Sequence, residues 1–577
     1  MIALLAWMPP QVGVLAAAVL GAVAAWEGRF DMDPDGVSYL DMADAYARRD
    51  WQNALNGVWS PLYSWILLPF LRGLRPDGYW EFPLVHAVNF LLYLGALAAF
   101  AYCLGQIVAY RHWRAAGGPG RSTEPSLPDR IVYATGYAVF VWGCVVSIRV
   151  SHVGPHVALA GLTFLVTGLL LRLRMHPDEW RSWAALGFAL GLTYLARTSA
   201  LAFVAVFFGF ALLRLPAGWL RARMTALRPL LALGVFALVA GVYAVPLLAV
   251  KRQFPGSDLV RLNYAWYVNG VPILHWQGDP PYGRPVHPTR VLFERPTVYE
   301  FDGPVGGTYP PWYDPAYWYR GIEPRFSLRG HLWRLRESVG TDSGYHAIPF
   351  SWSFGALAYI LAAAFLLRRG LFSWHRCKEY AELYVPTLLA LVSYPVLTIL
   401  PERFLGAFLP LLWMGTIVCV SWPADRPDRA RSATAAVYGI LVFHLAISTV
   451  MVGAVAVKGL VVPPRPTHWR IAQALHSHDI PPGSKVAVMG RARHAHWARL
   501  GRMRIVAEIR IRGGAAHEFW EVTDDRRYEL LTRLQAAGVH AVVVDPAARP
   551  DPAIPDDVGP WAWMELKETG HLVLVLR

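Results

Sequence analysis

Long apolar segments separated by short polar stretches occupy the first 457 residues of the chain. A helix of about 20 apolar residues crosses the hydrocarbon core of a bilayer, and many of these segments approach that length. We therefore predict a polytopic α-helical membrane protein with about eleven transmembrane helices. The predicted spans are roughly residues 11–26, 84–109, 131–147, 155–173, 183–197, 199–214, 229–250, 350–367, 383–400, 404–421 and 433–457.

The polar stretches between these segments alternate in charge. Every second stretch, beginning with the one after the second span, is rich in arginine, and the positive-inside rule places such loops in the cytoplasm. The N-terminus is then cytoplasmic, while loops 27–83 and 251–349 and the C-terminal chain lie outside the cytoplasmic (inner) membrane. The first apolar segment lacks a preceding basic region and a clear cleavage site, so we interpret it as a retained span. The net charge of +14 follows from this topology and does not indicate nucleic-acid binding.

One apolar segment does not fit this series. Pro61–Leu74 is only 14 residues long and contains Pro69, which favours a re-entrant or interfacial helix over a span. Counting it as a span would also invert every later loop against the charge rule. We therefore expect this helix not to cross the membrane.

After residue 457 the apolar spans end, and residues 458–577 predict a small extracytoplasmic α/β domain next to the transmembrane domain 1–457. An amphipathic helix is expected over Asp525–Ala537 and is closed by Gly538. The stretch VMGRARHAH lacks the spaced glycines of a dinucleotide site, which favours a supporting role for this domain. The expected strands are Lys485–Met489, Met503–Ala507, His540–Val544 and His571–Leu576.

Composition and motifs exclude several classes of protein. With 577 residues, 55% of them hydrophobic and 16% charged, and a mean hydropathy of +0.32, the chain is too apolar for an ordinary soluble protein. Its four cysteines lie in predicted spans or cytoplasmic loops, so we expect no disulfide framework. The sequence has no zinc-ligand spacing, Walker loop or GxSxG motif, which argues against ATP-driven pumping within this chain and against serine hydrolysis.

Three aspartates stand in the first external loop. Asp31, Asp33 and Asp35 precede an amphipathic helix that carries Tyr39 on its apolar face. Carboxylates clustered at a membrane edge need a chemical or a solvation reason. Asp35 stands where a helix N-cap is expected, so capping in a solvated loop is one explanation, and catalysis is the other.

The external loop 251–349 is too long for a bare connection and predicts a functional cover over the membrane surface. Aromatic residues are dense in TYPPWYDPAYWYRG, residues Thr308–Gly321, among prolines and glycines that we expect to prevent regular helices or strands. Aromatic faces stack on sugar rings, and they also anchor loops at the headgroup layer. We favour anchoring for any single residue, and sugar or lipid contact for the loop as a whole.

The segments DPDGVSYLDMADAY and WSPLYSWILL resemble the first external loop of GT-C membrane glycosyltransferases, which include protein O-mannosyltransferases and aminoarabinose transferases. The resemblance implies an inverting GT-C transferase whose catalytic aspartate is Asp35. Gly36 stands where many members carry Glu, which leaves Asp33 as the candidate second carboxylate. Three later segments are similar to motifs of the same superfamily: GLTYLARTSALAF (Gly191–Phe203), YDPAYWY (Tyr313–Tyr319) and PERFLGAFLPLL (Pro401–Leu412).

Sugar transfer from a polyprenyl phosphate to an acceptor hydroxyl requires a base and cations that hold the departing phosphate. Our candidate phosphate ligands are Arg403, Arg197 and His156. Alternative roles are an ion pair or snorkelling for Arg403, a helix cap for Arg197, and packing for His156 and His152.

The candidate substrate-contacting residues of the external loop are Tyr313, Trp318 and Tyr319. His156 stands where many relatives have Asp, so the sequence does not decide whether a divalent metal serves as a cofactor. The partners expected are a polyprenyl-phosphate-linked sugar, membrane lipids and a lipid, glycan or protein acceptor. The alternative functions are a lipid or polysaccharide transporter, for which an internal repeat is expected and none is found, and a non-catalytic scaffold for envelope assembly.

Overall fold

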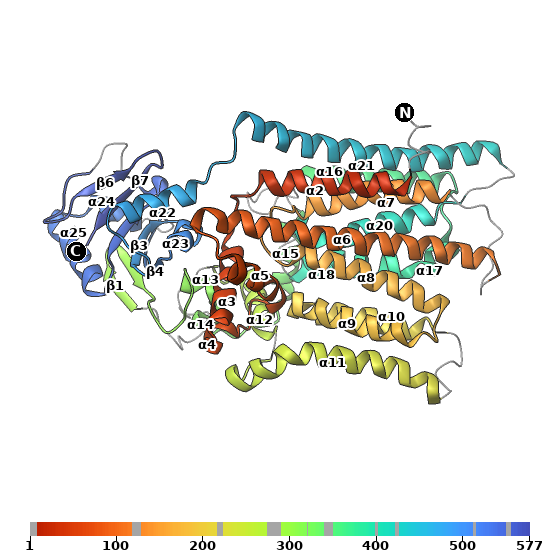
Figure 1. Cartoon of the computed structure of the whole chain (residues 1–577), viewed down its shortest axis with the longest axis horizontal. Helices are drawn as coiled ribbons and strands as arrows, with labels where there is room; N and C mark the ends of the chain where they lie inside the picture. Colours follow the sequence, from red (N-terminus) through yellow and green to blue (C-terminus); the bar gives the residue numbers. More distant parts are fainter. Residues whose placement is uncertain are drawn as a thin grey trace.

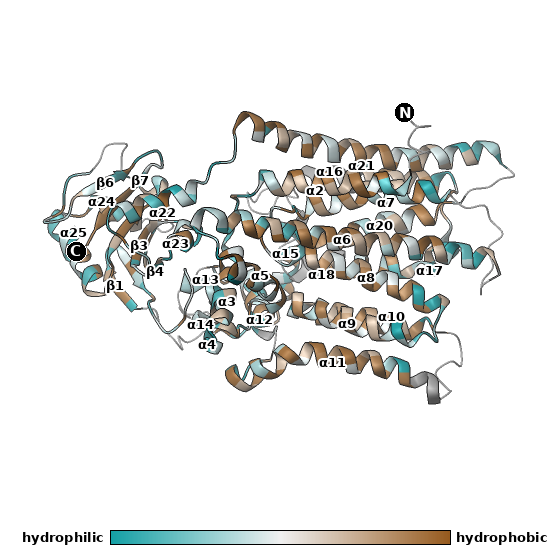
Figure 2. Ribbon diagram, viewed as in Figure 1, coloured by the Kyte–Doolittle hydropathy of each residue, from teal (hydrophilic) through white to brown (hydrophobic). Residues whose placement is uncertain are grey.

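The computed structural model describes residues 9–117, 128–215, 223–254, 256–273, 290–319, 321–339, 350–397, 402–421, 426–511, 515–549 and 555–576. Two parts stand end to end in Figure 1: a bundle of long helices, and a smaller sheet-containing part that carries the C-terminus. Figure 2 shows apolar residues along the bundle helices, with many hydrophilic residues near their ends. Apolar helices of this kind require a lipid environment, which defines a multi-pass membrane protein.

Every one of the predicted spans contains helix in the part of the chain that the structure describes. Among the described residues, six helices are long and apolar enough to cross a membrane, and four shorter apolar helices accompany them. The number of spans therefore stays a prediction. The bundle helices are α2 (Pro10–Glu27), α6 (Gly78–Ala115), α7 (Asp129–Val141) with the π-helical turn η1 (Trp142–Ser147), α8 (His156–Met175), α9 (Trp180–Ala196), α10 (Leu201–Leu213), α11 (Arg223–Lys251), α16 (Phe350–Arg368), α18 (Ala381–Leu397), α19 (Glu402–Leu405), α20 (Phe408–Val418) and α21 (Pro427–Val461).

Short helices fill the level between the bundle and the sheet (Figure 1). Helix α5 has the bounds expected from the sequence, Pro61–Leu74, and contains Pro69. It packs against α3 (Pro34–Ala47), α6 and α9. That α5 does not cross the membrane is still a prediction.

A seven-stranded sheet lies at the far end, with the strand order β1-β2-β4-β3-β5-β7-β6. Strand β3 is parallel to β4 and β5, and the other pairs are antiparallel. The strands are β1 (Arg290–Glu294), β2 (Thr297–Glu300), β3 (Lys485–Gly490), β4 (Arg504–Arg510), β5 (Ala541–Val544), β6 (Trp563–Leu566) and β7 (His571–Val575). The accompanying helices are α22 (Thr467–Ser477), α23 (Trp497–Leu500), α24 (Ala515–Glu521) and α25 (Asp524–Ala536).

The four expected strands and the expected helix are confirmed within a few residues, and Gly538 has the positive φ of a helix-terminating glycine. Strand β6 was not predicted, nor were β1 and β2, which pair with each other and join the sheet through β2 and β4. The sheet therefore takes two strands from the external loop, and the boundary at residue 458 stays a prediction.

The expectation that proline would prevent helices in the aromatic stretch is wrong. Helices α13 (Pro310–Tyr313) and α14 (Pro315–Trp318) form there, each with proline in its first turn. Proline is tolerated at that position because the first N–H groups of a helix have no intrahelical acceptor.

One arginine of the C-terminal domain joins the sheet to the bundle. The buried guanidinium of Arg499 lies 3.0 Å from Asp41, 2.6 Å from Asp44 and 2.6 Å from Glu81. Asp41 also accepts hydrogen bonds from the backbone and hydroxyl of Thr308, at 2.7 and 2.8 Å. Three segments far apart in the sequence are thus held around α3.

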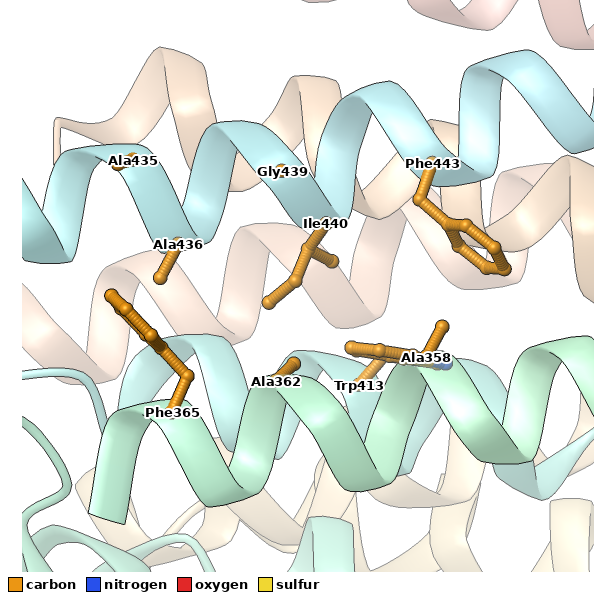
Figure 3. Close-up of a pocket in the computed structure, with 9 residues that line it drawn as sticks. All are labelled: Ala358, Ala362, Phe365, Trp413, Ala435, Ala436, Gly439, Ile440 and Phe443. Carbon is orange, nitrogen blue, oxygen red and sulfur yellow. The ribbon is translucent and has the colours of Figure 1, made fainter. Parts of the chain in front are cut away.

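A groove of about 340 Å³ lies between α16, α20 and α21. Figure 3 shows its nine lining residues, which come from these helices and are all apolar. None of the candidate site residues lines this groove. Its lining residues carry no acid, base or charged group that could serve in catalysis.

Candidate active site at the end of the bundle

The start of α3 assigns the two aspartates different roles. Asp33 is the N-cap, because its Oδ1 accepts a hydrogen bond from the backbone N–H of Gly36 at 2.9 Å. Pro34 takes the first helical position, where its missing N–H costs nothing. The expectation that Asp35 is the N-cap is therefore wrong. Asp35 lies inside the first turn, and its carboxylate contacts another part of the chain.

That contact is the indole of Trp312 on α13. Its Nε1 donates a hydrogen bond to Asp35 Oδ1 at 3.0 Å. The Trp312 ring stacks on Trp266, with centroids 6.1 Å apart and planes at 11°. The guanidinium of Arg493, from the C-terminal domain, lies 4.8 Å from the Trp312 ring centroid. The ring is thus fixed by contacts from two other segments, which holds the Asp35 carboxylate in one position.

The second carboxylate lies beside a histidine. Asp33 Oδ2 is 3.2 Å from Nδ1 of His152, in the loop before α8. Burial raises the pKa of Asp33 to about 6, although the Gly36 N–H and Arg403 oppose this shift. Burial, and then the nearby Arg403, lower the pKa of His152 to about 3. At neutral pH these pKa values leave the imidazole neutral and the neighbouring carboxylate ionised.

The two carboxylates influence each other. The pKa of Asp35 is raised by burial and then by the negative charge of Asp33, while Arg403 and His152 lower it. Two neighbouring carboxylates resist being ionised together, which raises the pKa of one of them towards neutral pH. A base for proton transfer near neutral pH needs that property.

Two cations lie near the carboxylates, and both contact the ring of Phe404 in α19. The guanidinium of Arg197, at the C-terminal end of α9, lies 4.2 Å from the Phe404 ring centroid, and that of Arg403 lies 5.5 Å from it. Arg197 Nε donates a hydrogen bond to Ser199 at 3.2 Å, whereas the buried Nε of Arg403 has no hydrogen-bond partner among the described residues. Arg403 therefore keeps donor capacity for an anion.

His156 completes this group at the start of α8. Its ring lies 5.1 Å from that of His152 and 5.4 Å from that of Phe404. The structure thus brings together Asp33, Asp35, His152, His156, Arg197 and Arg403, which the sequence placed in four separate segments. The roles proposed for these residues stay predictions.

The three aromatic residues expected to contact substrate are buried in the protein. Tyr313 donates its hydroxyl hydrogen to Asn53 O at 2.6 Å, and Tyr319 donates to Pro272 O at 3.0 Å. The indole of Trp318 donates to Pro310 O at 3.3 Å. All three pack in the core that supports α13, so the structure places them away from open surface. Their contact with substrate stays untested.

Trp312 and Arg493 are the site residues that sequence reasoning missed. Trp312 stands in the aromatic stretch that was singled out, but nothing in the sequence separates it from its neighbours. Arg493 stands in the VMGRARHAH stretch, which lacks the spaced glycines of a dinucleotide site and was therefore assigned a supporting role. No signal in the sequence connects either residue to Asp35. Among the described residues, no three His, Cys, Asp or Glu side chains form a metal-binding group.

The fold is similar to that of ArnT, so the resemblance to GT-C transferases seen in the sequence is confirmed at the level of the fold. ArnT from Cupriavidus metallidurans bound to undecaprenyl phosphate matches with a TM-score of 0.53 and 13% identity over 98% of each chain. Its apo state matches with a TM-score of 0.51, 13% identity and 99% coverage of both chains. The apo oligosaccharyltransferase of Archaeoglobus fulgidus has a TM-score of 0.43 and 11% identity, covering 93% of this chain and 69% of its own. No protein-family model and no curated protein matches the sequence.

Proposed function

We propose that this protein is a glycosyltransferase that moves a sugar from a polyprenyl-phosphate donor to an acceptor hydroxyl or related group. The observation that carries the proposal is the Asp35 carboxylate, held at 3.0 Å by Trp312 and raised in pKa by burial and by Asp33. The likeness of the fold to ArnT bound to undecaprenyl phosphate supports the class of donor.

In this proposal Asp35 accepts the proton of the acceptor hydroxyl as the acceptor oxygen attacks the anomeric carbon. The bond between that carbon and the phosphate oxygen breaks, and the electron pair leaves with the polyprenyl phosphate. Arg403, with Arg197 and His156 nearby, binds the departing phosphate. A single base and one direct displacement give inversion at the anomeric carbon.

The orientation that we propose follows from the charge of the loops. Eleven spans place the N-terminus in the cytoplasm and both the carboxylate site and the sheet domain outside. A lipid-linked donor then enters from the outer leaflet of the cytoplasmic membrane. Since Asp35 and Arg403 lie where the bundle ends, they meet the donor phosphate at headgroup depth.

Replacing Asp35 with Asn tests the proposal. Asn is nearly isosteric but cannot accept the proton, so transfer is expected to fall by about a hundredfold or more. The measurement is the release of undecaprenyl phosphate from a panel of undecaprenyl-phosphate-linked sugars by purified protein. Asp31→Asn is the matched control, because Asp31 is exposed in the same loop. Equal transfer by the Asp35 variant and wild type would leave Asp35 with a structural role only.

A further inference from the structure

The loop that carries His152 has an unusual backbone. It joins the π-helical turn η1 to α8, and Arg149 within it has a φ of 64°. A residue with a Cβ rarely adopts this left-handed conformation, because the side chain crowds the backbone. The N–H of His152 donates to Arg149 O at 2.9 Å and closes the turn. A loop of this shape needs contacts from the surrounding structure to keep it.

Asn89 of α6 supplies such contacts. Its side-chain Nδ2 donates hydrogen bonds to Val150 O at 3.3 Å and to His152 O at 3.2 Å. Carbonyl oxygens only accept, so the amide nitrogen must face the loop and Oδ1 must face away from it. The hydroxyl of Tyr63 on α5 donates to this Oδ1 at 2.6 Å. Asn89 and Tyr63 are both buried, where hydrogen bonds are stronger than in water.

Tyr63 also contacts the helix that carries the carboxylates. Its ring packs edge-on against that of Tyr39 on α3, with centroids 5.3 Å apart and planes at 81°. The start of α3 presents Asp33, whose Oδ2 lies 3.2 Å from Nδ1 of His152. Tyr63, with the amide that it orients, therefore joins the helix of Asp33 to the loop of His152.

We propose that Asn89, oriented by Tyr63, is a positioning residue that holds His152 against Asp33. This inference rests on the proposed function and adds a residue of the bundle to the support of its carboxylates. With His152 in place, the Asp33 carboxylate is kept beside Asp35, whose pKa its negative charge raises. Loss of the amide frees the loop, and it therefore impairs proton transfer more than binding of the donor.

Chemical labelling of the intact purified protein tests the position of His152 without turnover. Diethyl pyrocarbonate acylates the accessible nitrogen of a neutral imidazole, and mass spectrometry of the peptides gives the rate at each histidine. Asn89→Leu keeps the size and removes every hydrogen bond of the amide, so His152 is expected to react about threefold faster or more. The exposed His112, near the other end of α6, is the internal standard.

Tyr93→Phe is the matched control. Tyr93 stands one turn further along α6, is buried, and donates its hydroxyl hydrogen to Ala17 O of α2 at 2.7 Å. We expect its loss to leave the labelling of His152 at the wild-type rate. Tyr63→Phe keeps the ring and removes only the hydroxyl that orients Asn89, so His152 is expected to react faster in this variant. It replaces Asn89→Leu if that variant yields no folded protein.

Transfer measurements separate positioning from packing. We expect Asn89→Leu to lower kcat about tenfold and to leave KM for the donor nearly unchanged. In a His152→Gln background the same substitution is expected to have no further effect, because a positioning residue acts only through the group that it holds. A residue that merely packs the bundle lowers transfer equally in both backgrounds.

Two outcomes overturn the inference: labelling of His152 at the wild-type rate in Asn89→Leu and Tyr63→Phe, or equal losses of transfer in the two backgrounds. The proposed function fails on a different result, which is transfer by Asp35→Asn at the wild-type rate. In that case the labelling of His152 still decides whether Asn89 holds the loop.

Discussion

Asp33 and Asp35 are two residues apart, and the helix start separates their roles. The N-cap position directs the Asp33 carboxylate back to the backbone N–H of Gly36, and its other oxygen meets His152. Asp35, in the first turn, is free of that task and receives the indole N–H of Trp312. A difference of two positions at the helix start therefore separates a capping carboxylate from one that can exchange a proton.

The pH profile of activity is our prediction at the residue scale. Asp33→Asn removes the negative charge that raises the pKa of Asp35, and Asn still caps a helix. Asp35 then ionises at lower pH, so the acidic limb of the profile of kcat/KM is expected to move to lower pH. Transfer rates of the wild type and the variant between about pH 4 and 8 measure this shift. An acidic limb that stays in place contradicts the coupling of the two carboxylates.

The same carboxylate affects stability in a defined pH range. Asp33 has a folded-state pKa of about 6, above its ordinary value of 3.8, so the folded protein binds more protons than the unfolded chain between these values. The contribution of Asp33 to the free energy of unfolding therefore falls as the pH rises from about 4 to 6, and it is constant above that range. The Asp33→Asn variant lacks this contribution. Measuring the free energy of unfolding of the wild type and of this variant over the same pH range therefore separates the effect of Asp33 on stability from its effect on activity.

Among the elements, α3 is the one that links the site to the rest of the protein. Its first turn carries the carboxylates, and Asp41 and Asp44 on its later turns bind Arg499 of the C-terminal domain. Helix α13 reaches the same place because Thr308, just before it, binds Asp41. The position of Trp312 relative to Asp35 thus depends on an ion-pair network some distance along the same helix.

Arg499→Gln is the prediction at the element scale. It removes the buried partner of three carboxylates and leaves their charges uncompensated, which costs about 3–5 kcal/mol. We expect a large fall in the thermal unfolding temperature and faster proteolysis between the sheet domain and the bundle. Arg502→Gln is the control, since Arg502 contacts Glu81 and Asp44 but is 44% exposed, and exposed pairs contribute about 1 kcal/mol or less. Equal effects of the two variants contradict a central role for Arg499.

At the scale of the whole molecule, an apolar bundle and a sheet domain meet at the carboxylate site. The sheet is completed by β1 and β2 from the loop between bundle helices, so the two parts are joined by more than one chain connection. The aromatic stretch between β2 and α15 (Leu328–Val339) lies between the bundle and the sheet (Figure 1). Bundle, loop and C-terminal domain each contribute a charged or hydrogen-bonding side chain to the surroundings of Asp35.

The orientation in the membrane is a prediction for the whole molecule. A tag at the C-terminus is expected to be removed by protease added to cells with a permeabilised outer envelope and an intact cytoplasmic membrane. An N-terminal tag is the control and is expected to be protected, because the arginine-rich loops place that end in the cytoplasm. Protection of the C-terminal tag until the membrane is lysed would overturn the proposed orientation.

The sequence by itself determined the positions of the bundle helices, the bounds of α5 and four strands of the sheet. These features depend on local information: the length of an apolar run, the alternation of side chains in a strand, and the residues that begin or end a helix. The resemblance to GT-C transferases also rested on short local motifs, and it identified Asp33, Asp35, Arg197 and Arg403 before their proximity was known.

Only the tertiary structure decided which residues meet. Trp312 donates to a carboxylate 277 residues earlier in the chain, and Arg493 comes from a domain that the sequence assigned to support. Tyr313, next to Trp312, is buried in the core, since adjacent residues on a helix face different directions. The pKa values of Asp33 and Asp35 likewise depend on burial and on neighbours from other segments. Such contacts arise from the packing of whole elements, which local sequence patterns do not specify.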